Sequence, residues 1–260
     1  MLIALIGGLS SCDLSATLND SGGTSGTAEA REITVAAAAD LQFAFAEIGE
    51  LFERETGHNV TLVFGSTGHL AQQIENGAPY DLFAAANIEF VDQLVEKNLI
   101  LADSVSLYGR GRIVLAVNRQ SGIQANRLAD LSRPEIRNIA IANPDHAPYG
   151  KAAKQALIAA GLWNEIEDRL VFGENIRQTL QYIQTGDSEA GIIALSVANV
   201  PEITWTLIDE RLHDPLDQAL GVVVGSPHGE LARLFAQFIN GDEGRPIMRK
   251  YGFILPGETP

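Results

Sequence analysis

Short apolar runs alternate with amphipathic segments along most of this chain, and no other feature limits the fold as much. The first run begins at Ile33, and the segment after it has apolar residues at helical spacings of four, three and four: Leu41, Phe45, Ile48 and Phe52. Strands separated by helices of about this length are joined by right-handed crossovers and lie mainly parallel. The alternation therefore predicts an α/β fold in which mainly parallel sheets are flanked by helices.

The order of strand, loop and helix recurs toward the carboxyl end. We expect Gly57 to end the first helix. Further strands are expected at 59–64, 81–85, 191–194 and 220–226, at the start of 138–150, within 109–118 and near Val171. Helices are expected after the turn at 65–68, at 88–98, at 149–160, between the strands near Val171 and Gly191, and at 230–240. Ligands of such sheets collect in the loops at the carboxyl ends of the strands. A binding site is therefore expected among these loops.

Four of these loops carry a small or polar residue where a strand ends and a helix begins. They are Ala39-Asp40, Ser66-Thr67, 145–150 and 174–177. The second belongs to a glycine-rich turn, whose exposed N–H groups and positive helix end suit an anion. Each loop alone fits ordinary helix capping. Together, in a chain without catalytic motifs, they predict an anion cradle between two lobes.

Composition excludes several other functions. The net charge is −15, and the 18 Lys and Arg residues are dispersed, which argues against a nucleic-acid partner. The sequence has no phosphate-loop lysine motif, no nucleophile elbow and no complete dinucleotide loop. Its five histidines lack the spacing of metal ligands. We therefore expect no enzyme, no cofactor, no metal centre and no catalytic residues.

The amino end resembles an export signal. The apolar segment MLIALIGGLSSC ends at Cys12, the single cysteine, in the manner of a bacterial lipobox. A lone buried cysteine is the alternative interpretation. Residues 13–30 are rich in Ser, Thr and Gly and are typical of a flexible tether. We therefore predict lipidation of Cys12, an extracytoplasmic location, and a membrane contact through the lipid anchor.

Five segments, in order and spacing, resemble the molybdate-binding proteins of ABC importers, the ModA family. They are ITVAAAADL, FGSTGHLAQQIENGAPYDLFAAAN, NPDHAPYGKAAKQAL, ENIRQTL and RKYGF. The resemblance covers about Ile33 to Phe253 and implies a monomeric, two-lobed solute-binding protein that serves an ABC permease. It implies two chain crossovers, with lobe one at 31–114 and 218–260 and lobe two at 115–217, which follow the signal-like segment at 1–12 and the tether at 13–30.

The resemblance also implies the site. A molybdate or tungstate oxyanion is held without charged side chains, by Ala39, Asp40 and Ser66 of lobe one and by Tyr149 and Ile176 of lobe two, mostly through main-chain N–H groups. Selectivity against sulfate comes from cavity size. Two positions depart from the family pattern. Asp40 stands where many members have a hydroxyl residue, and Ala194 where many have Tyr, for which Tyr149 is a candidate substitute.

A carboxylate facing a dianion is repelled, so Asp40 needs an explanation. We favour a side chain that turns back to cap the helix through the N–H of Gln42 or Phe43. Alternatively, Asp40 takes up a proton when the oxyanion binds and donates a hydrogen bond to it. A site for a different oxyanion or small solute, and a sensor or enzyme domain on the same scaffold, are the rival functions.

Overall fold

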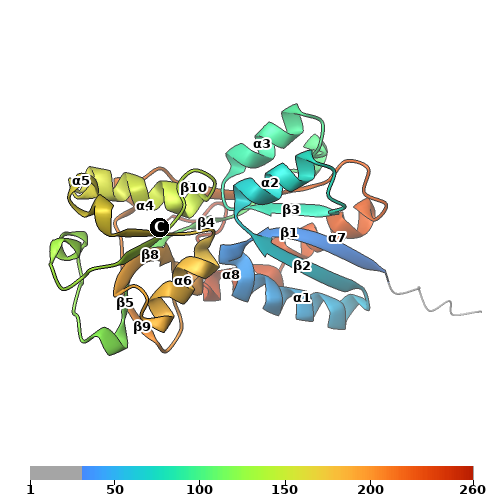
Figure 1. Ribbon diagram of the computed structural model, residues 1–260. Coiled ribbons are helices and arrows are strands. Elements are labelled where there is room, and N and C mark those ends of the chain that lie inside the picture. Colours follow the sequence, from blue (N-terminus) through green and yellow to red (C-terminus); the bar gives the residue numbers. More distant parts are fainter. Residues whose placement is uncertain (1–30, 260) are drawn as a thin grey trace, which may run out of the picture.

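The structure is a computed structural model that describes residues 31–259, and its strands form two five-stranded sheets (Figure 1). The first has the order β2-β1-β3-β10-β4, with β1 at Glu32–Ala38, β2 at Asn59–Gly65, β3 at Leu82–Ala85, β4 at Ser106–Gly111 and β10 at Leu216–Val222. The second has the order β7-β6-β8-β5-β9, with β5 at Ile113–Asn118, β6 at Ile139–Ala142, β7 at Leu170–Gly173, β8 at Ala190–Ala194 and β9 at Ile203–Leu207. We call each sheet with its helices a lobe, lobe one containing the first sheet.

Both sheets share one pairing scheme. Three strands of each are parallel, β2-β1-β3 and β7-β6-β8. In each sheet one further strand, β10 or β5, pairs antiparallel with both of its neighbours, so four of the five strands run in the same direction. The predicted α/β fold with mainly parallel sheets is confirmed, and each sheet is mixed through one reversed strand. The reversed strands β5 and β10 are those that enter their sheet directly from the other lobe instead of through a helical crossover within the sheet.

The chain passes between the sheets twice, once from β4 to β5 and once from β9 to β10. The two predicted crossovers are thereby confirmed. Only Arg112 separates β4 from β5, so the apolar segment at 109–118 belongs to both sheets rather than to one strand. The predicted lobe boundaries after residues 114 and 217 fall within β5 and β10.

Helices cover the faces of both sheets. In lobe one α2 (Thr67–Glu75) and α3 (Ile88–Glu96) lie on one face, and α1 (Gln42–Thr56) and α7 (Gly229–Asn240) lie on the other (Figure 1). Helix α8 (Gly244–Lys250) packs against α1 and α7, while α4 (Pro148–Ala159), α5 (Trp163–Ile166) and α6 (Ile176–Thr185) belong to lobe two. Helix α1 stops at Gly57, whose φ of 72° is left-handed, as the sequence predicts.

The first strand is buried on both faces, which explains its unbroken apolar sequence. Val35 and Ala37 belong to the core that contains the aromatic residues of α1 and α7, where the rings of Phe52 and Phe235 pack edge to face at 5.0 Å. Ala36 points the other way, into the core under α2 and α3. Packing on both faces fixes the carboxyl end of β1, where the candidate site lies.

Candidate functional site

All five residues predicted to bind the ligand line one small cavity between the lobes. Its lobe-one wall consists of Ala38, Ala39, Asp40, Gly65, Ser66, Thr67 and Ala86, and its lobe-two wall of Ala147, Pro148, Tyr149, Asn175 and Ile176. The cavity volume is about 10 Å³, room for about one water molecule. The two walls are therefore nearly in contact.

Four helical segments begin at this cavity. A 3₁₀ turn, η1 (Ala39–Leu41), leads into α1, while α2, α4 and α6 follow β2, β6 and β7. All of these strands are members of the parallel sets, so their carboxyl ends lie on the same side of each sheet. The first N–H groups of a helix have no partner within the helix and carry partial positive charge. Both lobes therefore direct positive helix ends at one point.

Helix α6 shows which N–H group is available. The Asn175 side chain accepts hydrogen bonds from the N–H groups of Arg177 and Gln178, and the Thr179 N–H donates to the Asn175 carbonyl. The Ile176 N–H, at the cavity wall, has no such acceptor among the residues that the structure describes. Helix α4 begins with Pro148, which has no N–H, so the Tyr149 N–H is its first donor.

The predicted capping role of Asp40 is wrong. Helix α1 has Leu41 at its N-cap, and no side chain caps it. The reason is the 3₁₀ turn between β1 and α1, which holds Asp40 ahead of the first turn of α1 and away from the N–H groups of Gln42 and Phe43. Its carboxylate instead points toward lobe two and β10.

Asp40 is the centre of a buried hydrogen-bond network. Its Oδ2 accepts from the Tyr149 hydroxyl and from Gln218 Nε2, both at 2.9 Å, and Gln218 Nε2 also lies 2.9 Å from the Tyr149 hydroxyl oxygen. The side chain is fully buried, and burial raises its pKa to about 6 against the opposing effect of the two donors. Its Oδ1 has no hydrogen-bond partner among the described residues.

Sequence reasoning missed three residues around Asp40. Gln218 lies in β10, which begins four residues before the predicted strand because its polar start interrupts the apolar pattern. Ser196 donates a 2.8 Å hydrogen bond to the Asp40 carbonyl. Gly111 gives room to the network, since a Cβ there would collide with the Tyr149 hydroxyl. No local sequence pattern points to any of the three, because each acts on a residue far away in the chain.

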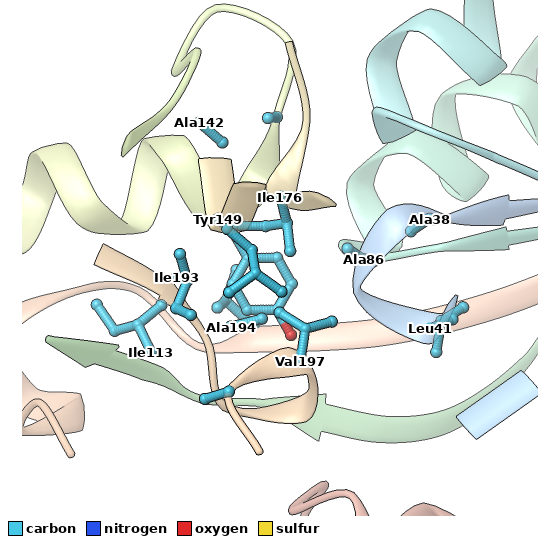
Figure 2. Close-up of a cluster of buried hydrophobic side chains, with 14 of the residues drawn as sticks. Ala38, Leu41, Ala86, Ile113, Ala142, Tyr149, Ile176, Ile193, Ala194 and Val197 are labelled. Carbon is cyan, nitrogen blue, oxygen red and sulfur yellow. The ribbon is translucent and has the colours of Figure 1, made fainter. Parts of the chain in front are cut away.

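The Tyr149 ring lies in an apolar setting in lobe two. Figure 2 shows the ring among Ile176, Ile193, Ala194 and Val197, all buried. The small side chain of Ala194 leaves this space to Tyr149, whose hydroxyl then reaches Asp40 in the other lobe. Burial, with the charge of Asp40, raises the pKa of the Tyr149 phenol well above its ordinary value. The hydroxyl therefore keeps its proton and acts as a donor.

On the other side of the cavity, the loop of lobe two that contains His146 contacts lobe one and holds the two lobes together. The Ser66 hydroxyl donates to the His146 carbonyl at 2.6 Å and lies 2.8 Å from His146 Nδ1. The Gly68 N–H donates to the same carbonyl at 2.9 Å, and a Cβ at Gly68 would lie 2.7 Å from that oxygen. The Ser66 side chain, which was predicted to bind the ligand, therefore bridges the two lobes.

Two more side chains extend this bridge outward. The rings of His69 and His146 stack with centroids 3.9 Å apart, and His69 Nδ1 lies 3.4 Å from a Glu174 carboxylate oxygen. Burial, and then the neighbouring His69, lower the pKa of His146. Neither histidine was predicted to have a role in the site. Within residues 31–259, no group of three or more His, Cys, Asp or Glu side chains is placed to hold a metal ion.

The family model of bacterial extracellular solute-binding proteins matches residues 33–254. The chain belongs to this family. A molybdate-binding protein, ModA, of Azotobacter vinelandii is 32% identical over 233 residues, which cover 88% of this chain and 92% of that protein. A Bacillus subtilis protein named as a substrate-binding lipoprotein of an ABC transporter is also 32% identical, with 85% of each chain covered.

Comparison with a solved structure supports the same family assignment. The periplasmic molybdate-binding protein of Azotobacter vinelandii superposes with a TM-score of 0.81 at 27% identity, and the match covers 86% of this chain and 99% of that one. The two lobes and the cleft between them are therefore features of a solute-binding protein that works outside the cytoplasm. In the part of the chain that the structure describes, no helix is long and apolar enough to cross a membrane.

The bridge between Ser66 and His146 predicts a measurable effect on stability. Ser66→Ala removes the hydroxyl donor to the partly buried His146 carbonyl, and we expect the free energy of unfolding to fall by about 1 kcal/mol. Ser188→Ala is the matched control, because the buried Ser188 hydroxyl has no partner among residues 31–259. Urea denaturation measures both variants. Equal stability changes in the two would contradict a bridging role for Ser66.

Proposed function

We propose that this protein is the extracytoplasmic solute-binding component of an ABC importer and that it captures a tetrahedral oxyanion, molybdate or tungstate, between its lobes. One observation carries the proposal: four helical N-termini from two lobes meet at a cavity to whose lining residues 31–259 contribute no Lys, Arg or His. Such a site binds an anion through oriented N–H groups. The protein delivers its ligand to the permease as a monomer and carries out no chemical step.

The groups that donate hydrogen bonds to the ligand are the N–H groups at the cavity wall that lack an acceptor among the described residues. Lobe one supplies the Ala39-Asp40 turn and Ser66, and lobe two supplies the N–H groups of Tyr149 and Ile176. Several charge-assisted hydrogen bonds bind a dianion firmly. Because the donors are divided between two lobes, separation of the lobes removes half of them at once. The ligand is then released to the permease without any change of protonation in a basic side chain.

The lobes have to part before the ligand enters. A tetrahedral oxyanion is larger than the single water for which the cavity has room. Opening breaks the contacts of Ser66 and Gly68 with His146, and the exposed pair formed by Lys151 and Glu89, whose charged atoms are 3.5 Å apart. The proposed lobes are residues 31–114 with 218–260, and residues 115–217, and they rotate about the two crossovers as hinges.

The choice of molybdate or tungstate rests on the relatives. The Azotobacter vinelandii and Escherichia coli proteins that this chain resembles are named as molybdate-binding proteins. We propose that selectivity against sulfate comes from the size of the cavity once the ligand is bound, because fixed N–H donors fit one ion radius best. A different oxyanion or small solute is the second candidate, and the observation that favours it is that an acidic residue, Asp40, lines the cavity.

The central test is a binding measurement with a main-chain variant. Isothermal calorimetry with molybdate and tungstate should detect tight binding by the wild-type protein and none with neutral amino acids. Ile176→Pro removes the N–H group at the first position of α6, where proline is well tolerated. Loss of a hydrogen bond to a charged group is worth about 1.5 to 3 kcal/mol, so the affinity should fall at least about tenfold.

Ile176→Ala is the control for this variant, because it keeps the N–H group and loses most of the side chain. We expect it to bind molybdate with nearly the wild-type affinity. Equal losses in both variants would mean that the Ile176 side chain, and not its N–H group, matters. Absence of oxyanion binding by the wild-type protein would refute the proposed function.

We also propose that Cys12 anchors the protein to the membrane through a lipid. Cys12 and the tether at 13–30 lie outside the described residues, so the proposal rests on the lipobox-like sequence and on the Bacillus subtilis relative that is named as a lipoprotein. Cys12→Ala should move the protein from the membrane fraction to the soluble fraction or leave it unprocessed. A variant that stays anchored and is processed normally would contradict lipidation.

A further inference from the structure

The cavity combines two features that conflict. Helical N-termini surround it, yet Asp40, the one acidic residue that residues 31–259 contribute to its lining, is fully buried and has no cationic neighbour in that lining. An ionised Asp40 would repel any anion that the N–H groups attract. The arrangement therefore needs a positive charge whenever an oxyanion is present.

The hydrogen bonds of Asp40 show where that charge belongs. Oδ2 already accepts from two donors, Tyr149 and Gln218, whereas the buried Oδ1 accepts from none of the described residues. A buried carboxylate oxygen without a donor is strongly unfavourable. Oδ1 is thus the one oxygen of this carboxyl group that has room for a proton.

We propose that the site takes up its oxyanion together with one proton, which lies between Asp40 Oδ1 and an oxygen of the ligand. The proposal rests on the oxyanion function given above. The proton comes from solvent and forms one O–H bond, either on Asp40 or on the ligand, and a hydrogen bond to the other oxygen. The combined charge of Asp40 and a dianion then changes from −3 to −2, and Oδ1 gains its missing partner.

The other groups that face Asp40 do not bind or release this proton, so it is shared only by Asp40 and the ligand. Tyr149 of α4 and Tyr108 of β4 are phenols whose pKa burial raises well above the ordinary value, so both stay neutral. Gln218 of β10 and Ser196 of η6 (Leu195–Val197) do not titrate. No charged group contributes to the shifted pKa of Asp40, which burial raises to about 6.

The hydrogen-bond network around Asp40 also couples uptake of the proton to closure of the lobes. Tyr149 reaches Asp40 from lobe two, while Gln218 reaches it from lobe one. When the lobes separate, Asp40 loses the Tyr149 donor and meets water, which favours the ionised carboxylate. The proton and the oxyanion are therefore released together, and the freed negative charge opposes rebinding.

Calorimetry of the full-length protein between about pH 6 and about pH 8 tests the proposal, with molybdate and tungstate as ligands. In buffers of different ionisation enthalpy, the wild-type protein should take up close to one proton per ligand at about pH 8, and fewer at about pH 6, where the free carboxyl is already partly protonated. Its affinity should fall about tenfold for each pH unit above the pKa of Asp40. Asp40→Asn places a permanent N–H donor at the Oδ1 position, so it should bind with an affinity independent of pH and take up no proton.

The stacked histidine pair at the mouth of the site supplies the necessary control, because histidine is the other kind of side chain near the cavity that can bind a proton. His69→Gln should keep the wild-type pH slope if Asp40 is the proton site. A slope that vanishes in His69→Gln and persists in Asp40→Asn would overturn the proposal. So would wild-type binding without proton uptake, which leaves the oxyanion function intact. If neither wild-type nor Asp40→Asn protein binds an oxyanion at any pH, the function itself is refuted.

Discussion

The whole binding site depends on helical N-termini that the two sheets direct at one cavity. Each of these termini follows a strand of a parallel set, and the parallel strands of a lobe end on the same side of their sheet. The positive ends therefore converge without any basic side chain. This convergence explains how a chain with a net charge of −15 can present a local attraction for an anion. It also explains why ligand capture and lobe closure are the same event.

A second constraint is the buried carboxyl group of Asp40. In the same small space, Asp40 receives hydrogen bonds from Tyr149 of one lobe and Gln218 of the other, and Gly111 leaves the space that the Tyr149 hydroxyl needs. The network ties the lobes together on one side of the cavity, as the contacts of Ser66 with His146 do on the other. If Asp40 only capped a helix, its side chain would not need hydrogen bonds from Tyr149 and Gln218.

Much of the fold could be predicted from the sequence because its signals are local. The strand beginning near Ile33 and the helix stop at Gly57 follow from apolar spacing and from the left-handed conformation that glycine adopts. The meeting of the four loops at one anion site was predicted from their small and polar residues at the ends of strands, and the family resemblance supplied the individual ligand residues. The orientation of Asp40 could not be predicted, because a single 3₁₀ turn decides it. Gln218 was missed because its role arises from a strand that returns from the other lobe.

A crystal structure with tungstate tests the central claim most directly, because tungsten can be located by its anomalous scattering. The account predicts one strong anomalous peak between the lobes, with tungstate oxygens within hydrogen-bond distance of the N–H groups of Tyr149 and Ile176 and no Lys or Arg side chain in contact. A peak held by basic side chains elsewhere on the protein, with the cavity between the lobes still closed, would contradict it.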